Sequence, residues 1–167
     1  ATSLGAASGI VAGLVAITPS CSSVNVLGAL VVGFLGGAIC ALAVGLKFKF
    51  GFDDALDVVG VHMVGGLTGT LLIGFLAAPE APAAVKGLFY GGGFDQLWRQ
   101  AVGAFAVLAY SFIVTTILAL ILKFTIGLRL GEEDEAGGID EAEHAETGYD
   151  FVPVGGTSVL ARHGAEE

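Results

Sequence analysis

Four apolar segments, separated by short polar breaks, occupy most of the first 130 residues. A helix needs about 20 apolar residues to cross a bilayer, and we expect each segment to form one such helix, although the first is short. The predicted helices cover about residues 3–18, 24–46, 55–78 and 94–127. The fourth segment is longer than a crossing requires, so we expect it to tilt or to project beyond the bilayer.

The composition supports a membrane protein with a polar extension. The chain is 54% hydrophobic and 14% charged and contains 27 glycines, which is typical of closely packed membrane helices. We predict an all-α, polytopic membrane helix bundle over residues 1–130, followed by an acidic tail over residues 131–167. Nothing in the sequence is basic enough to indicate nucleic-acid binding. The chain begins without methionine inside an apolar stretch, as the later part of a longer protein would.

Glycines recur every four residues on three of the segments, which places them on one face of each helix. Such strips let helix backbones approach closely. The strips are Gly5, Gly9 and Gly13 on the first segment, Gly33 and Gly37 on the second, and Gly65 and Gly69 on the third. The fourth segment has no comparable strip and is rich in large apolar side chains, which favours a peripheral position facing lipid.

Basic residues indicate the orientation of the helices in the membrane. With one crossing per segment, those near the ends of the second and fourth segments lie on one side and outnumber those on the other. They are Lys47, Lys49, Lys123 and Arg129, against Lys86 and Arg99. Because positive charge favours the inner side, we predict an integral membrane protein whose loop 47–53 and C-terminus are cytoplasmic.

His62 is the residue that the apolar pattern does not explain. It lies in the third segment, where an ionisable side chain is costly unless it faces a cavity, a pore or a polar partner. One interpretation is a pore histidine, kept neutral by its low-dielectric surroundings, with one ring nitrogen donating and the other accepting. Such a group can bind a small polar solute or pass its proton. The alternative is a structural histidine that is hydrogen-bonded to a neighbouring helix.

Acidic residues crowd the start of the third segment. Asp53, Asp54 and Asp57 suit this position, because carboxylates interact favourably with the helix dipole and cap free N–H groups. We interpret Asp57 as a structural residue at the entry, with a direct role on a cation as the alternative. Val58 lies one helical turn before His62 and shares its face, which would make the wall beside the imidazole apolar.

The sequence contains no pattern typical of an enzyme, a cofactor site or a metal site. Cys21 and Cys40 have neither CxxC spacing nor histidine companions, so we interpret both as small packing residues.

The acidic tail has few apolar residues and would be disordered on its own. It nevertheless contains side chains that could dock on a cytoplasmic surface or on a partner. These are Ile139, Tyr149, Phe151 and Val152. A fully solvated tail is the alternative.

Four blocks of sequence cover nearly the whole chain outside residues 79–98 and those after Val152. They are SGIVAGLVAITPSCSSVNVLGALVVG at 8–33, DDALDVVGVHMVGGLTGTLLIGF at 53–75, GLRL at 127–130 and EEDEAGGIDEAEHAETGYDF at 132–151. Together they resemble the C-terminal portion of the ammonium transporter family (Amt/Rh/methylamine permease). The resemblance implies a homotrimer with one pore per subunit, formed between two inverted halves of an eleven-span fold. This chain would supply the last four spans.

The resemblance also implies roles for individual residues. His62 matches the second of two pore histidines, Val58 a pore-lining position and Asp57 a structural acidic residue. Family members recruit an ammonium ion at an outer aromatic site by cation–π contact, remove its proton and pass neutral ammonia along the histidine pair. The remaining participants belong to earlier spans. Met63 is a departure, because the family usually has glycine after this histidine.

The tail pattern carries its own implication. Gly138, Asp140 and Tyr149 match positions of a regulatory tail that docks beneath the trimer and contacts a PII-type protein, in the plasma membrane of a prokaryotic cell. Ala142 stands where plant members have a regulatory threonine, so that switch should be missing.

Two hypotheses follow from these observations. In the first, the chain belongs to an ammonium transporter in which His62 lines the pore and the tail regulates activity. In the second, it is a membrane-anchored sensor or binding module whose acidic tail recruits a cytoplasmic PII-type protein without transport. Half a pore cannot conduct, so under the first hypothesis this polypeptide should not transport on its own.

Overall fold

The computed structural model describes residues 2–146, which are helical and contain no strand. The all-α fold predicted from the sequence is therefore confirmed. The backbone divides into two compact units, the first ending at Ile113 and the second beginning at Val114. In chain order the elements are α1 Ser3–Ile17, α2 Val26–Phe50, the π-helix η1 Val58–Met63, α3 Val64–Leu76, the 3₁₀-helix η2 Leu88–Tyr90, α4 Asp95–Thr125, α5 Glu132–Gly137 and α6 Ile139–His144.

Three of the helical stretches in the described residues are long and apolar enough to cross a membrane. They are Val26–Phe50, Val58–Leu76 and Asp95–Thr125, and α1 is a shorter apolar helix. The second helix continues past residue 46, because Lys47 and Lys49 in its last turn interact favourably with the helix dipole. It ends at Gly51, whose φ of 67° is accessible to glycine at little cost.

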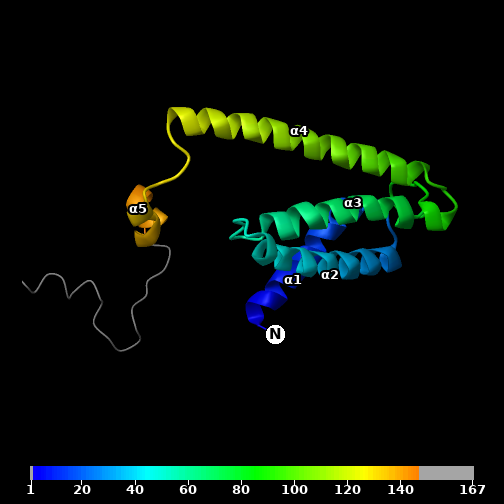
Figure 1. Cartoon of the computed structure of the whole chain (residues 1–167). Helices are drawn as coiled ribbons and strands as arrows, with labels where there is room; N and C mark the ends of the chain where they lie inside the picture. The colour runs from blue at the N-terminus through cyan, green and yellow to red at the C-terminus, as the bar shows by residue number, and fades with distance from the viewer. Residues whose placement is uncertain (1, 147–167) are drawn as a thin grey trace, which may run out of the picture. The chain divides into compact units, whose positions relative to one another are not determined.

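Helices α1, α2 and α3 form the core of the first unit and lie side by side (Figure 1). Small side chains make this possible, because a Cβ on Gly36 would overlap Ala16, and one on Gly69 would overlap the Ala16 carbonyl. The buried face of α2 consists of Gly28, Val32, Gly36 and Cys40, spaced every four residues.

This packing changes part of the glycine interpretation. Gly65 and Gly69 on α3 do form a close-approach strip, as expected. Gly33 and Gly37 on α2 do not, because a Cβ added to either meets nothing within 4 Å. The face of α2 that contacts α1 is one residue out of step with the predicted strip and centres on Gly36.

The segment between α3 and α4 folds back on the start of α2. Ala78 N–H donates to the Ser23 carbonyl at 2.9 Å, and Ala83 N–H donates to the Ser22 carbonyl at 2.8 Å. The Asn25 side chain caps α2 by accepting from Gly28 N–H at 2.9 Å. Its amide nitrogen donates at 2.7 Å to both Glu80 Oε1 and the Tyr90 hydroxyl. One side chain thus joins the first turn of α2 to both halves of the loop.

Candidate functional site around His62

His62 lies in a π-helical turn, not in the regular α-helix that the sequence predicted across residues 55–78. The π-helix covers Val58–Met63, and Val64 N–H donates to the Val59 carbonyl, five residues back. Residues 55–57 precede it without helical structure. π-Helices are rare, occur mainly as single turns and are frequent at functional sites. The residue that the sequence singled out thus sits in the least regular turn of its helix.

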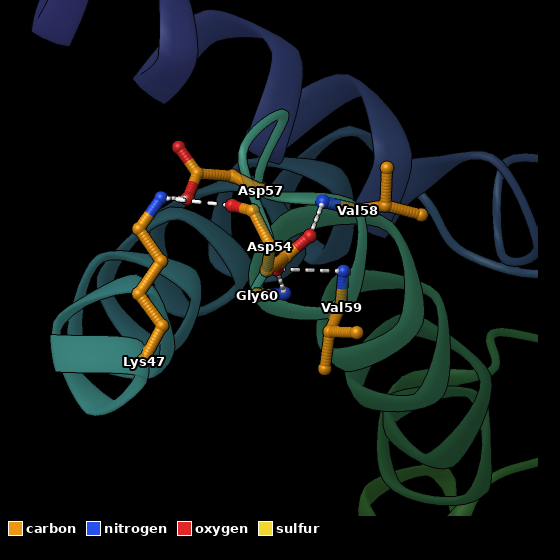
Figure 2. A network of polar contacts seen from close by, with 6 residues as sticks. All are labelled: Lys47, Asp54, Asp57, Val58, Val59 and Gly60. Atoms are coloured by element: carbon orange, nitrogen blue, oxygen red, sulfur yellow. Dashed lines mark hydrogen bonds and ion pairs between the residues drawn. The ribbon is translucent and has the colours of Figure 1, made fainter. Parts of the chain in front are cut away.

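The start of the π-helix is capped by one carboxylate. Asp54 Oδ1 accepts from Val58 N–H at 2.7 Å, and Oδ2 accepts from Val59 N–H at 3.0 Å and Gly60 N–H at 3.2 Å. Figure 2 shows the carboxylate aimed at these groups. Because the first N–H groups of a helix have no partner within it, Asp54 stabilises the turn directly. Capping was expected of the acidic cluster, and the structure assigns it to Asp54.

Asp57 has a different partner. Its backbone is in the left-handed region, with φ at 56°, and its side chain makes no capping hydrogen bond. Oδ1 instead forms an ion pair with Lys47 Nζ at 2.5 Å, and Lys47 Nζ also donates to the Asp54 carbonyl oxygen at 2.9 Å. Figure 2 shows Lys47 reaching from α2 to both acidic residues. This pairing supports the structural interpretation of Asp57, because its charge is already balanced.

The face of η1 that carries His62 is not covered within the described residues. His62 is exposed, and Val58 and Met63 are 53% and 43% exposed. Among residues 2–146, the imidazole forms no hydrogen bond or ion pair. It borders a groove of about 270 Å³ between the first half of α1 and η1. The groove is lined by Leu4, Ala7, Ser8, Val11, Leu56, Asp57, Val61 and His62.

The neighbouring face of η1, which carries Val61, is tightly packed. Val61 is 5% exposed and forms a buried cluster with Ala12 and Cys40. The Cys40 thiol donates to the Val61 carbonyl at 3.5 Å, and Cys21 and Cys40 are both free. The histidine-bearing turn is therefore fixed on one side and open on the other.

Two residues at this site were not singled out from the sequence. From the sequence alone, Lys47 is evidence only for orientation in the membrane, and Cys40 is interpreted as a small packing residue. The ion pair of Lys47 could have been suspected from its position ten residues before Asp57, because Gly51 ends α2 between them and allows the chain to turn back. No comparable signal existed for Cys40, because its contact depends on how α2 and η1 cross.

The tail residues belong to the second unit. Gly138 joins α5 to α6 with φ at 112°, a value that favours glycine, and Asp140 lies in the first turn of α6. Tyr149, Phe151 and Val152 lie outside the described residues. The Arg129 guanidinium binds the Glu135 carboxylate through two hydrogen bonds, at 3.0 and 2.8 Å.

Comparisons with known proteins agree with the resemblance found in the sequence. An ammonium transporter from Mycobacterium tuberculosis is 72% identical over 173 residues, covering 100% of this chain and 36% of that protein. One from Corynebacterium glutamicum is 43% identical, covering 89% of this chain and 33% of that protein. The crystal structure of Saccharomyces cerevisiae Mep2 superposes with a TM-score of 0.72 at 38% identity, covering 79% of this chain and 31% of that one.

The chain thus spans about a third of the length of the relatives it matches. Residues 1–149 match the Ammonium Transporter Family. Family membership, the helical architecture and the apolar spans together identify an integral membrane protein. The chain belongs to the ammonium transporter family.

Proposed function

We propose that this chain forms the C-terminal part of an ammonium transporter, in which His62 lines the pathway for ammonium or ammonia. The observation that carries the proposal is the exposed imidazole on an apolar helix, bordering a groove and without a partner among residues 2–146. Such a group in a membrane helix is costly unless a cavity, pore or polar partner faces it. The remaining wall of the pathway would come from the earlier spans that the family resemblance implies.

The chemistry of the site suits a small nitrogen base. A neutral imidazole accepts a hydrogen bond at one ring nitrogen and donates one from the other, so it can exchange hydrogen bonds with ammonia without holding a charge. Val58 is exposed on the same turn and would make the adjoining wall of the pathway apolar. An apolar wall disfavours hydrated ions, because ions in a low-dielectric site lose their hydration.

Asp57 plays a supporting role in this proposal. Its ion pair with Lys47 neutralises the carboxylate near the groove, so we assign no solute-binding role to it. Asp54 and Asp57 instead hold the turn on which His62 sits.

Family membership supports a proposal for the wider assembly. We propose a homotrimer in a prokaryotic plasma membrane, with the loop 47–53 and the tail on the cytoplasmic side. We further propose that the tail, including Gly138, Asp140 and Tyr149, regulates transport and contacts a PII-type protein.

The direct test is His62→Ala in the complete transporter, with methylammonium uptake as the measurement. We expect uptake to fall by about tenfold, because the variant loses the hydrogen bonds between the imidazole and the solute, and a lost hydrogen bond costs about 1–3 kcal/mol. His144→Ala is the matched control, since this histidine lies in α6 outside the apolar spans. Undiminished uptake in His62→Ala would refute the pore assignment, whereas the alternative of an anchored sensor predicts no uptake in the wild type either.

A further inference from the structure

We propose that Cys40 is a positioning residue for His62, holding the π-helical turn in the conformation that directs the imidazole into the transport pathway. This inference rests on the proposed function of His62. Cys40 lies on α2 and does not take part in the transport chemistry itself.

The contact is specific and buried. Cys40 is 1% exposed, and its thiol donates across the helix interface to the carbonyl oxygen of Val61 at 3.5 Å. Val61 immediately precedes His62 and is itself 5% exposed. A thiol is a weak donor, but in a water-free interface it competes with no solvent for this carbonyl. The bond therefore acts on the peptide unit that precedes the histidine.

Close packing makes the position of Cys40 restrictive. A Cβ added to Gly65 would lie 3.0 Å from the Cys40 sulfur, and one added to Gly60 would meet Val44 at 2.8 Å. The thiol thus sits between the Val61 carbonyl and the backbone of Gly65. A shift of this side chain changes the backbone on both sides of His62.

Two contacts from outside the turn restrain it, one at its start and one at Val61. Asp54 accepts from the N–H groups of residues 58–60, and Cys40 donates to the carbonyl of Val61. His62 itself makes no hydrogen bond with α2 among the described residues. The direction of the His62 side chain is therefore set through the peptide unit of Val61. This unit lies in the π-helical turn, whose hydrogen-bond pattern differs from that of the α-helix that follows.

The experiment compares Cys40→Ala, which removes the donor, with Cys40→Ser, which keeps a donor of similar size, in the complete transporter. Methylammonium uptake is measured as KM, maximal rate and pH profile, alongside the amount of protein in the membrane. We expect Cys40→Ala to change KM by about two- to tenfold, the effect of losing one hydrogen bond, and to shift the pH profile. Cys40→Ser should keep the wild-type KM and the wild-type pH profile.

Gly65→Ala provides a second approach, because its methyl group presses on the thiol from the other side. It should shift the pH profile in the same direction as Cys40→Ala. Cys21→Ala is the matched control, since Cys21 is exposed and distant in sequence from the turn.

The outcomes separate this inference from the function on which it rests. If Cys40→Ala lowers only the maximal rate, in proportion to the protein present, its role is structural packing and the inference is wrong. Wild-type kinetics in both Cys40→Ala and Gly65→Ala refute it as well. If His62→Ala also transports normally, the proposed function fails with it.

Discussion

The ion pair between Lys47 and Asp57 connects the end of α2 to the start of the turn that carries His62. The two side chains are 15% and 27% exposed, so each charge depends on the other more than a surface pair would. Lys47 also donates to the Asp54 carbonyl oxygen, and the Asp54 carboxylate caps η1. At this scale the candidate site is a series of polar contacts from Lys47 through Asp54 and Asp57 that supports the apolar turn η1.

We expect Lys47→Met to destabilise the protein by about 1–3 kcal/mol, because it leaves Asp57 without its charged partner. The measurement is the thermal unfolding of the purified transporter in detergent. Lys49→Met is the matched control, since Lys49 lies in the same last turn but is exposed. The double variant Lys47→Met/Asp57→Asn should lose less than the sum of the two single losses. Equal destabilisation by Lys49→Met would contradict the assignment.

At the scale of elements, the helix positions could be read from the sequence, but the register within the site could not. The four apolar runs coincide broadly with α1, α2, η1–α3 and α4. The π-helix was invisible because one extra residue per turn leaves the apolar pattern of VVGVHM almost unchanged. The contacting face of α2 was also misread, because glycine frequency does not reveal which of two neighbouring glycines, Gly36 or Gly37, meets α1.

Only part of the site could be predicted from the sequence. The pattern singled out His62 and the acidic cluster, because both are chemically out of place beside apolar helices. The sequence could not show that Asp54 caps the helix while Asp57 pairs with Lys47, since these roles depend on the left-handed backbone at Asp57. Cys40 became relevant only through the helix crossing.

The loop after α3 is expected to respond to acid. The Asn25 amide donates to Glu80 and lowers the pKa of this carboxyl below its ordinary value. The folded state therefore favours the charged form. This contribution to stability is complete above the ordinary pKa of glutamate and is lost as the pH falls through the lowered value.

The measurement is limited proteolysis of the loop as the pH is lowered through the acidic range. Wild-type cleavage should rise on acidification, while Glu80→Gln, which retains an acceptor but cannot titrate, should show a weaker pH dependence. Asn25→Ala should expose the loop at neutral pH as well. Asp95→Asn serves as control, because its exposed ion pair with Arg99 lies outside the Asn25 contacts. A Glu80→Gln profile identical to that of the wild type would argue against this role.

At the scale of the whole molecule, the long helices of the described part expose extensive apolar surface. None of the residues of α4 is buried, and large apolar side chains are exposed along every long helix of the described part. Exposed apolar surface of this extent marks contact with lipid or with other protein segments. This matches a chain that spans about a third of its relatives.

Removal of residues 132–167 should leave membrane insertion intact, because the apolar spans found among residues 2–146 all precede residue 132. We expect transport to decrease or to lose its response to nitrogen status, since the proposed regulatory tail is gone. The measurements are the amount of transporter in the membrane and methylammonium uptake with and without a PII-type protein. Glu135→Gln is a milder variant, because it removes only the ion pair with Arg129. A truncated transporter with unchanged regulated uptake would exclude a role for the tail.

The single π turn has one more consequence, for insertions and deletions. Each residue advances an α-helix by about 100°, and α3 is locked to α1 and α2 by Gly65 and Gly69, while the chain before the turn is locked by Asp54. Loss of one residue between these two fixed points would let the turn relax to an ordinary helix and rotate the imidazole out of the groove. The segment should therefore accept exchanges of side chains far more readily than changes in its length.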